Sequence, residues 1–254
     1  MTLVIANPED AKFNIYGDTK LTEVKRKGLE REFNEQNSIP GILKMFIINR
    51  DFCLCSAGVY SFALKTLREI TNSSNKSKEE LCSIIYRNHI ESYEFSTSEG
   101  TDFILCSRIE KHCTLWRNGS SGFETSNTCY IGSVDAYNSI DSESSNRRSI
   151  FDLVANEDFP SIGGIVLSVY NNGTSFAYGS MLSVYFQNKT DAHPSRNFQL
   201  TTVPPTLPES RVGIFLPDKN YGYLYDPIEE DRPIKIAASD AREFQYRANL
   251  RSSS

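Results

Sequence analysis

The amino-acid sequence predicts an α+β fold in which antiparallel strands form sheets that helices cover. Segments with strand character come in groups and helical segments come in pairs between them, whereas a parallel α/β fold alternates single strands with single helices. The chain has 254 residues, of which 39% are hydrophobic, and this is enough for a substantial core. We therefore expect a sandwich of sheets covered by helices.

Two short hairpins are predicted at the start of the chain. The first joins strands at 2–6 and 12–16, and the second joins strands at 42–48 and 52–56, because apolar and β-branched residues flank polar turn residues in both. The charged stretch 23–37 between the hairpins is expected to be a loop or a short exposed helix.

Two helices are predicted next. Apolar residues at helical spacing place the first over 61–70, and Ser77 with Glu80 resembles a capping box that begins the second. Further strands are expected at 102–106, 112–116, 128–131, 162–170 and 174–178, with a helical region at 134–155 that the polar stretch 142–149 interrupts.

The character of the chain changes near residue 188, where prolines become frequent and hydrophobic periodicity weakens. We expect a first domain over residues 1–187 and an irregular C-terminal extension over residues 188–254. The extension is expected to wrap the core or to contact a neighbouring chain, and residues 251–254 to form a disordered tail.

Charge and hydropathy exclude several classes of protein. The net charge is −5 and there is no basic block, so the chain is poorly suited to binding a phosphate backbone. Its mean hydropathy is −0.40, and no apolar run approaches the roughly 18 residues that a membrane helix needs. The N-terminus lacks the basic and apolar regions of a signal peptide, so we expect a cytoplasmic protein.

The cysteines do not have the spacing of a metal site. There are six of them and three histidines, and no Cys-x-x-Cys pair occurs. Buried, reduced thiols are expected instead. No metal or organic cofactor is expected.

Thr2 becomes chemically interesting if Met1 is removed, which the small side chain of residue 2 permits. The free α-amine of Thr2, with an ordinary pKa of about 7.7–8.0, could then take the proton of its own hydroxyl. Nucleophile and base would belong to one residue. A Met-Thr start alone is weak evidence, because many proteins begin in this way.

Three further residues make such a site plausible. Alternation places Lys44 on the same face as Phe46 and Ile48, which we expect to be buried, and a buried lysine needs a carboxylate partner. Asp18, at the end of the second predicted strand, is the natural candidate. Gly58 lies at a strand-to-helix turn, where a bare backbone N–H could face a developing oxyanion.

This combination resembles the proteasome β-type subunits and the related peptidase subunits of bacterial ATP-dependent threonine proteases, which are N-terminal nucleophile hydrolases. The resemblance extends over about residues 2–180. The parts of the sequence that carry it are Thr2, residues 17–22 (Gly-Asp-Thr-Lys-Leu-Thr), Lys44, residues 57–58 (Ala-Gly), residues 130–133 (Tyr-Ile-Gly-Ser) and residues 158–164 (Asp-Phe-Pro-Ser-Ile-Gly-Gly).

The resemblance implies a four-layer αββα sandwich of two antiparallel sheets. It also implies a threonine-type endopeptidase that cleaves peptides and unfolded proteins inside a self-assembled homo-oligomeric ring, with an ATP-dependent unfoldase as a possible partner.

Residue roles follow from the same resemblance. Thr2 would be the nucleophile, Lys44 held by Asp18 would ease removal of its proton, and the Gly58 N–H would stabilise the oxyanion. Side chains expected to hydrogen-bond around the Thr2 amine are Ser133, Asp158 and Ser161, and those expected to line the substrate pocket are Lys20, Leu21, Ser56, Tyr60 and Leu64.

The sequence departs from the family pattern in three places. The loop between Thr22 and Lys44 is longer than usual, and Val134 stands where the family prefers glycine. Ile162 is inserted before two glycines, so the alignment of Ser161 is ambiguous by one residue.

Two other interpretations stay open. The first is a catalytically inactive scaffold subunit of the same fold, against which the joint presence of Thr2, Asp18 and Lys44 argues. The second is an amidohydrolase of the same class that acts on small amides, which a monomer with a closed pocket would favour.

Overall fold

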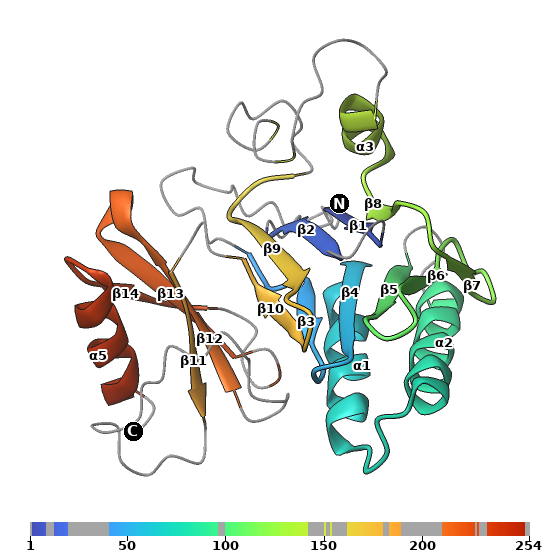
Figure 1. Ribbon diagram of the computed structural model, residues 1–254, viewed down its shortest axis with the longest axis horizontal. Helices are drawn as coiled ribbons and strands as arrows, with labels where there is room; N and C mark the ends of the chain where they lie inside the picture. Colours follow the sequence, from blue (N-terminus) through green and yellow to red (C-terminus); the bar gives the residue numbers. More distant parts are fainter. Residues whose placement is uncertain are drawn as a thin grey trace.

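The computed structural model describes residues 2–8, 13–19, 41–95, 100–141, 150, 153, 162–179, 183–188, 210–226, 228 and 233–251. Within these residues the chain forms three antiparallel sheets together with helices, which confirms the α+β class (Figure 1).

The first sheet has the strand order β10-β9-β2-β1-β8, and every neighbouring pair is antiparallel. Its strands are β1 (Leu3–Asn7), β2 (Asn14–Asp18), β8 (Cys129–Gly132), β9 (Val166–Asn171) and β10 (Phe176–Tyr178). The second sheet has the order β3-β4-β5-β6-β7 and is also antiparallel. Its strands are β3 (Met45–Ile47), β4 (Phe52–Gly58), β5 (Thr101–Ser107), β6 (His112–Trp116) and β7 (Phe123–Thr125).

These two sheets pack face to face. Val4 and Met45 belong to one core cluster that draws on both sheets. Gly17 permits this approach, because a Cβ at its position would lie 3.2 Å from Val4 Cγ2 and 3.3 Å from Met45 Sδ. Tyr178 adds a polar link, since its hydroxyl donates to the Met45 carbonyl at 2.7 Å. The core between the sheets is therefore closely packed.

Helices lie on the outer sides of this pair of sheets. α1 (Tyr60–Asn72) and α2 (Lys78–Phe95) bury Leu67 and Leu81 in the cluster that includes the second sheet, and the His89 ring meets Phe103 of β5 edge-on. α3 (Val134–Asp141) is on the far side of the first sheet, where Ala136 shares a separate cluster with Leu3 (Figure 1).

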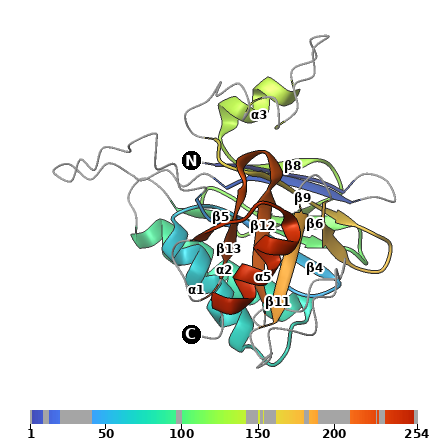
Figure 2. The same ribbon diagram turned by 90° about the vertical axis from the view of Figure 1, so that its left-hand side faces the viewer.

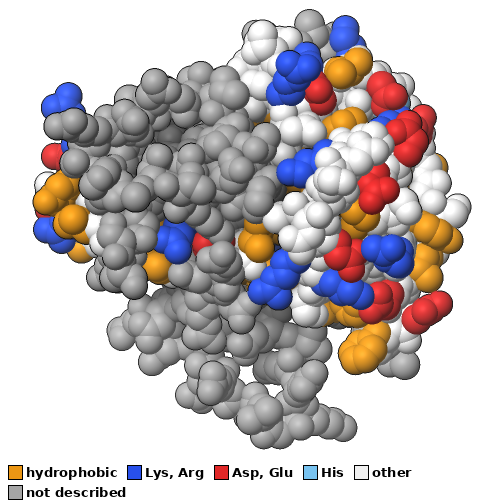
Figure 3. Space-filling model, turned by 90° about the horizontal axis from the view of Figure 1, so that it is seen from below, with side chains coloured by type: hydrophobic (Ala, Val, Ile, Leu, Met, Phe, Trp, Pro, Cys, Tyr) orange, Lys and Arg blue, Asp and Glu red, His pale blue; other side chains and the backbone are white. Residues whose placement is uncertain are grey.

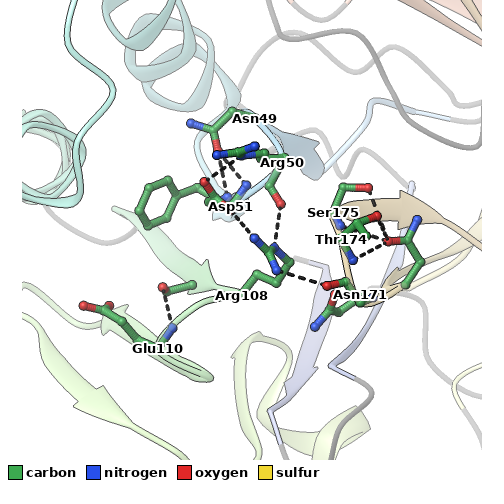
Figure 4. Close-up of polar contacts among 12 residues, drawn as sticks. Asn49, Arg50, Asp51, Arg108, Glu110, Asn171, Thr174 and Ser175 are labelled. Atoms are coloured by element: carbon green, nitrogen blue, oxygen red, sulfur yellow. Dashed lines mark hydrogen bonds and ion pairs between the residues drawn. The ribbon is translucent and has the colours of Figure 1, made fainter.

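Polar contacts join the two sheets at the turn that follows β3. Arg108 donates Nη2 to the Asp51 carboxylate at 2.5 Å, Nε to the Arg50 carbonyl at 3.2 Å and Nη1 to the Gly173 carbonyl at 3.2 Å. Figure 4 shows Arg108 beside Arg50 and Asp51, which follow β3. Gly173 lies in the turn between β9 and β10. Because both turns are at the same end of the strands, Arg108 fixes that end of the sandwich.

The C-terminal part of the chain forms a third sheet, so the prediction of an irregular extension is wrong. Its strands run in the order β11-β12-β13-β14, and α5 (Ala241–Arg251) packs on it (Figure 2). The strands are β11 (Ser183–Asn188), β12 (Ser210–Leu216), β13 (Tyr221–Tyr225) and β14 (Ile234–Ala237).

Prolines misled the sequence-based prediction because they lie between these strands rather than in them. Pro217 begins the short 3-10 turn η2 (Pro217–Lys219) after β12, and Pro233 immediately precedes β14. β11 spans the expected boundary between residues 187 and 188, and the division into two domains stays a prediction. Residues 252–254 of the expected tail lie outside the described residues.

Where the described residues form the surface seen from below, basic and acidic side chains are interspersed with one another (Figure 3). All six cysteines are free, five of them buried and Cys82 half-buried. Cys106 and Cys113 face each other across β5 and β6 with their sulfur atoms 3.6 Å apart. In the described part of the chain, no group of three or more His, Cys, Asp or Glu side chains is arranged to hold a metal ion.

Candidate active site

Three polar side chains meet at the end of the sandwich opposite the Arg108 contacts. Thr2 precedes β1, Asp18 ends β2 and Lys44 precedes β3. The antiparallel register of β1 and β2, in which Val4 faces Gly17, brings residue 2 to the level at which β2 ends. All three residues are deeply buried, with exposed fractions of 3%, 1% and 5%.

The Thr2 hydroxyl lies between a carboxylate and an ammonium group. It donates a hydrogen bond to Asp18 Oδ1 and accepts one from Lys44 Nζ. Lys44 Nζ is also 3.3 Å from Asp18 Oδ1, so the two charges form a buried ion pair. Either charge alone would be costly to bury, and pairing offsets that cost. The structure therefore brings together the three residues that the sequence singled out first.

Backbone donors hold the Asp18 carboxylate from two further directions. The Leu3 N–H donates to Oδ1 at 3.0 Å, and the Gly163 N–H donates to Oδ2 at 3.0 Å. Gly163 belongs to the segment that precedes β9, far from Asp18 in the sequence. Because donors reach both oxygens, the carboxylate is fixed in one orientation beside Thr2.

Gly132 and Ser133 hold the backbone of Thr2. The Ser133 N–H donates to the Thr2 carbonyl at 2.6 Å, and the Ser133 hydroxyl accepts from the Ala136 N–H at 3.4 Å at the start of α3. Gly132 has φ of +97°, and a Cβ there would lie 1.8 Å from the Thr2 carbonyl oxygen. Only glycine fits this close approach. The structure thus places Ser133 beside Thr2, in contact through its backbone.

Gly58 ends β4, which contacts Lys44 just before β3. The Ser56 N–H donates to the Lys44 carbonyl at 2.9 Å, and Gly58 follows Ser56 by two residues. Gly58 has φ of +120°, and a Cβ there would lie 2.2 Å from the Gly100 carbonyl oxygen, so this turn also requires glycine.

A buried polar network from α2 supports the turn at Gly58. The Thr101 hydroxyl donates to the Val59 carbonyl at 2.9 Å, and the Thr101 N–H donates to Ser92 Oγ at 2.8 Å. His89 Nδ1 lies 2.7 Å from the Thr101 carbonyl, which can only accept, so Nδ1 carries the proton. Burial lowers the pKa of His89 and favours the neutral ring. Sequence reasoning assigned His89 no role, since nothing in its local pattern reveals this distant partner.

Thr19 is a site residue that sequence reasoning did not single out. It is 1% exposed, its hydroxyl accepts from the Ile165 N–H at 2.8 Å, and its carbonyl accepts from the Ile42 N–H at 2.9 Å. Its position directly after Asp18 is the one signal that could have indicated it.

The remaining predicted site residues fall into two groups. Tyr60 and Leu64 lie in the first turns of α1, half-buried and buried respectively. Those that lie outside the described residues are Lys20, Leu21, Asp158 and Ser161.

Comparisons with known proteins do not place the chain in a family. No family model matches it, and no curated protein matches it. Among solved structures it is similar to the "Anbu (Gly-1) mutant from Hyphomicrobium sp. strain MC1", with 12% sequence identity, a TM-score of 0.48, and coverage of 70% of this chain and 86% of that chain.

The predicted membership of the proteasome β-type subunits or of the bacterial threonine protease subunits is therefore wrong. No family model supports it, and the similarity to a solved structure, at 12% identity, is too distant to place the chain there. The chemistry of the site rests on the geometry of its own residues.

Among the helices in the described residues, none combines the length and the apolarity needed to cross a lipid bilayer.

Proposed function

We propose that the protein is an amide-bond hydrolase of the threonine endopeptidase type, with the Thr2 hydroxyl as its nucleophile. One observation carries the proposal: the buried Thr2 hydroxyl is hydrogen-bonded to both members of the Asp18–Lys44 ion pair. A hydroxyl between an acceptor and a cation is oriented by the first and made more acidic by the second.

The reaction proceeds in two halves once Met1 has been removed. The α-amine of Thr2 takes the hydroxyl proton, the oxygen attacks the carbonyl carbon of the amide, and the Lys44 ammonium stabilises the negative charge at the attacking oxygen. The Gly58 N–H is the proposed donor to the oxyanion of the tetrahedral intermediate. The C–N bond then breaks, the protonated amine gives its proton to the leaving amine, and an ester to Thr2 remains.

Water completes the cycle. The Thr2 amine takes a proton from water, the hydroxide attacks the ester carbonyl, and the acid leaves as the proton returns to the Thr2 oxygen. Asp18 keeps Lys44 in place through both halves.

The ion pair favours an enzyme over an inert scaffold. A buried ion pair adds little to stability compared with well-packed apolar residues, so a scaffold gains nothing from Asp18 and Lys44 beside Thr2. The amidohydrolase alternative uses the same chemistry and differs in its substrate.

An acylating reagent tests the nucleophile directly. A peptide β-lactone is expected to add one equivalent of its mass to a chain that lacks Met1, as measured by intact mass spectrometry, with Thr2 as the modified residue in peptide mapping. Thr2→Ala should give no adduct, whereas Thr174→Ala, at an exposed turn, should react like the wild type. A chain that retains Met1, or an adduct that survives in Thr2→Ala, would contradict the mechanism.

The four-layer αββα arrangement and the homo-oligomeric ring belong to the same proposal. Helices on both outer sides of the facing sheets support the four-layer arrangement. The outer surfaces of these helices are free to form contacts between subunits of a ring. Light scattering coupled to size-exclusion chromatography is expected to give a mass several times that of the 28.7 kDa chain. A monomer would argue for the small-amide hydrolase. The cleavage of unfolded proteins, the unfoldase and the cytoplasmic location stay predictions.

A further inference from the structure

The third sheet packs against the core that contains the candidate site. In β12 and β13, Val212 and Ile214 pair with Tyr225 and Tyr223, and all four belong to the same core cluster as Val4 and Met45. The alternate residues of these strands face α5 instead, where a Cβ on Gly222 would lie 2.5 Å from the Phe244 ring. One face of this sheet therefore completes the core, and the other is covered by α5 (Figure 2).

The last residue of β13 makes a polar contact with the site. Tyr225 is 4% exposed, and its hydroxyl is hydrogen-bonded to the side chain of Thr19. Burial raises the pKa of Tyr225 far above its ordinary value, so the phenol stays neutral. The hydroxyl is thus a neutral hydrogen-bonding group in contact with the residue that follows Asp18.

The end of β13 is itself held in place. Asp226 is buried and accepts from Arg211 Nε at 3.2 Å and from the Ile228 N–H at 3.1 Å. The Ile228 carbonyl in turn accepts from Arg68 Nε of α1 at 3.0 Å. Contacts with β12 and with α1 therefore determine where the neighbouring Tyr225 lies.

Thr19 transmits this position to the catalytic groups. It is covalently next to Asp18, it binds the Ile165 N–H two residues beyond the Gly163 donor to Asp18, and it binds the Ile42 N–H two residues before Lys44. A displacement of Thr19 would therefore move Asp18 itself and the segments that carry Gly163 and Lys44.

We propose that Tyr225 is a positioning residue for Thr2, Asp18 and Lys44, and that the C-terminal sheet is a built-in support of the candidate active site. This inference rests on the proposed function. In this inference the C-terminal sheet holds Thr19 through Tyr225, and Thr19 in turn positions the carboxylate of Asp18.

Tyr225→Phe removes the hydroxyl and keeps the ring in the core. The loss of one buried hydrogen bond is expected to lower kcat about tenfold while KM changes less than twofold. Tyr223→Phe is the matched control, because Tyr223 lies on the same strand and face but its hydroxyl bonds to Tyr221. The control is expected to keep the wild-type kcat.

Variants of Thr19 test the contact from the other partner. Thr19→Ser keeps the hydroxyl, so its kcat should stay at the wild-type value. Thr19→Val lacks the hydroxyl, so its kcat should fall. The double variant Thr19→Val/Tyr225→Phe should be no worse than Thr19→Val alone, because both changes remove the same interaction. Fully additive losses would overturn the inference.

Amide hydrogen exchange separates this inference from the proposed reaction. The Gly163 and Ile165 amides should exchange several-fold faster in Tyr225→Phe than in the wild type or in Tyr223→Phe. If the wild type forms no β-lactone adduct, the proposed function fails, and exchange still reports whether Tyr225 holds the site. Equal exchange in the two variants, or an unchanged kcat in Tyr225→Phe, would overturn the positioning role.

Discussion

Lys44→Ala is expected to abolish measurable amide hydrolysis while the chain remains folded and assembled. The substitution removes the cation that contacts the Thr2 hydroxyl, and the loss of one such stabilising group typically lowers kcat about 100- to 1000-fold. Asp18 keeps the Leu3 and Gly163 N–H groups as donors, so its carboxylate is not left without partners. Steady-state hydrolysis of a peptide amide measures the effect.

The control for this experiment is Lys65→Ala. Lys65 pairs with Glu91 on the surface, where its side chain is 41% exposed, and an exposed pair contributes little to stability. It should hydrolyse the peptide at the wild-type rate. Unchanged turnover in Lys44→Ala, with light scattering showing intact assembly, would remove Lys44 from the mechanism.

Gly132→Ala is expected to destabilise the fold strongly, although it adds only one methyl group. The new Cβ would lie 1.8 Å from the Thr2 carbonyl oxygen, at a φ of +97° that already disfavours side chains. Either Thr2 or β8 must move. We expect the free energy of unfolding in urea to fall by about 3 kcal/mol or more, and the β-lactone adduct at Thr2 to be lost.

Gly173→Ala separates the clash from the backbone strain. Gly173 has nearly the same φ, +95°, yet nothing lies within 4 Å of a Cβ at its position. This variant should lose only about 1–2 kcal/mol of unfolding free energy from strain and should keep its reactivity. Equal losses in the two variants would show that the contact with Thr2 does not matter.

Regular elements with a clear hydrophobic period were predictable from the sequence. The strand expected at 112–116 is β6, and the two helices expected after the second hairpin are α1 and α2 with slightly different ends. β7 was missed because its three residues, two of them exposed, carry no burial pattern. The C-terminal sheet could not be predicted, because the prolines between its strands interrupt the hydrophobic period of this part of the sequence.

Only those parts of the candidate site whose side chains stand out in the sequence could be predicted. A lysine in an apolar run signals a buried charge, and so Lys44 and its carboxylate partner could be found. The donors that hold the site, such as the Gly163 and Ser133 N–H groups, are backbone atoms that every residue type except proline carries. Which of these backbone groups reach the site depends on the fold, so no local sequence pattern identifies them.

The contacts around Asp18 join parts of the chain that are far apart in order. Their separations are 16 residues to Thr2, 26 to Lys44 and 145 to Gly163. Contacts of such long range require the closure of long loops, so we expect the complete arrangement to form late in folding. A nascent or damaged chain that lacks any one of these segments cannot form the complete set of contacts around Thr2 and Asp18. If the proposed function holds, we expect only fully folded molecules to form the β-lactone adduct at Thr2.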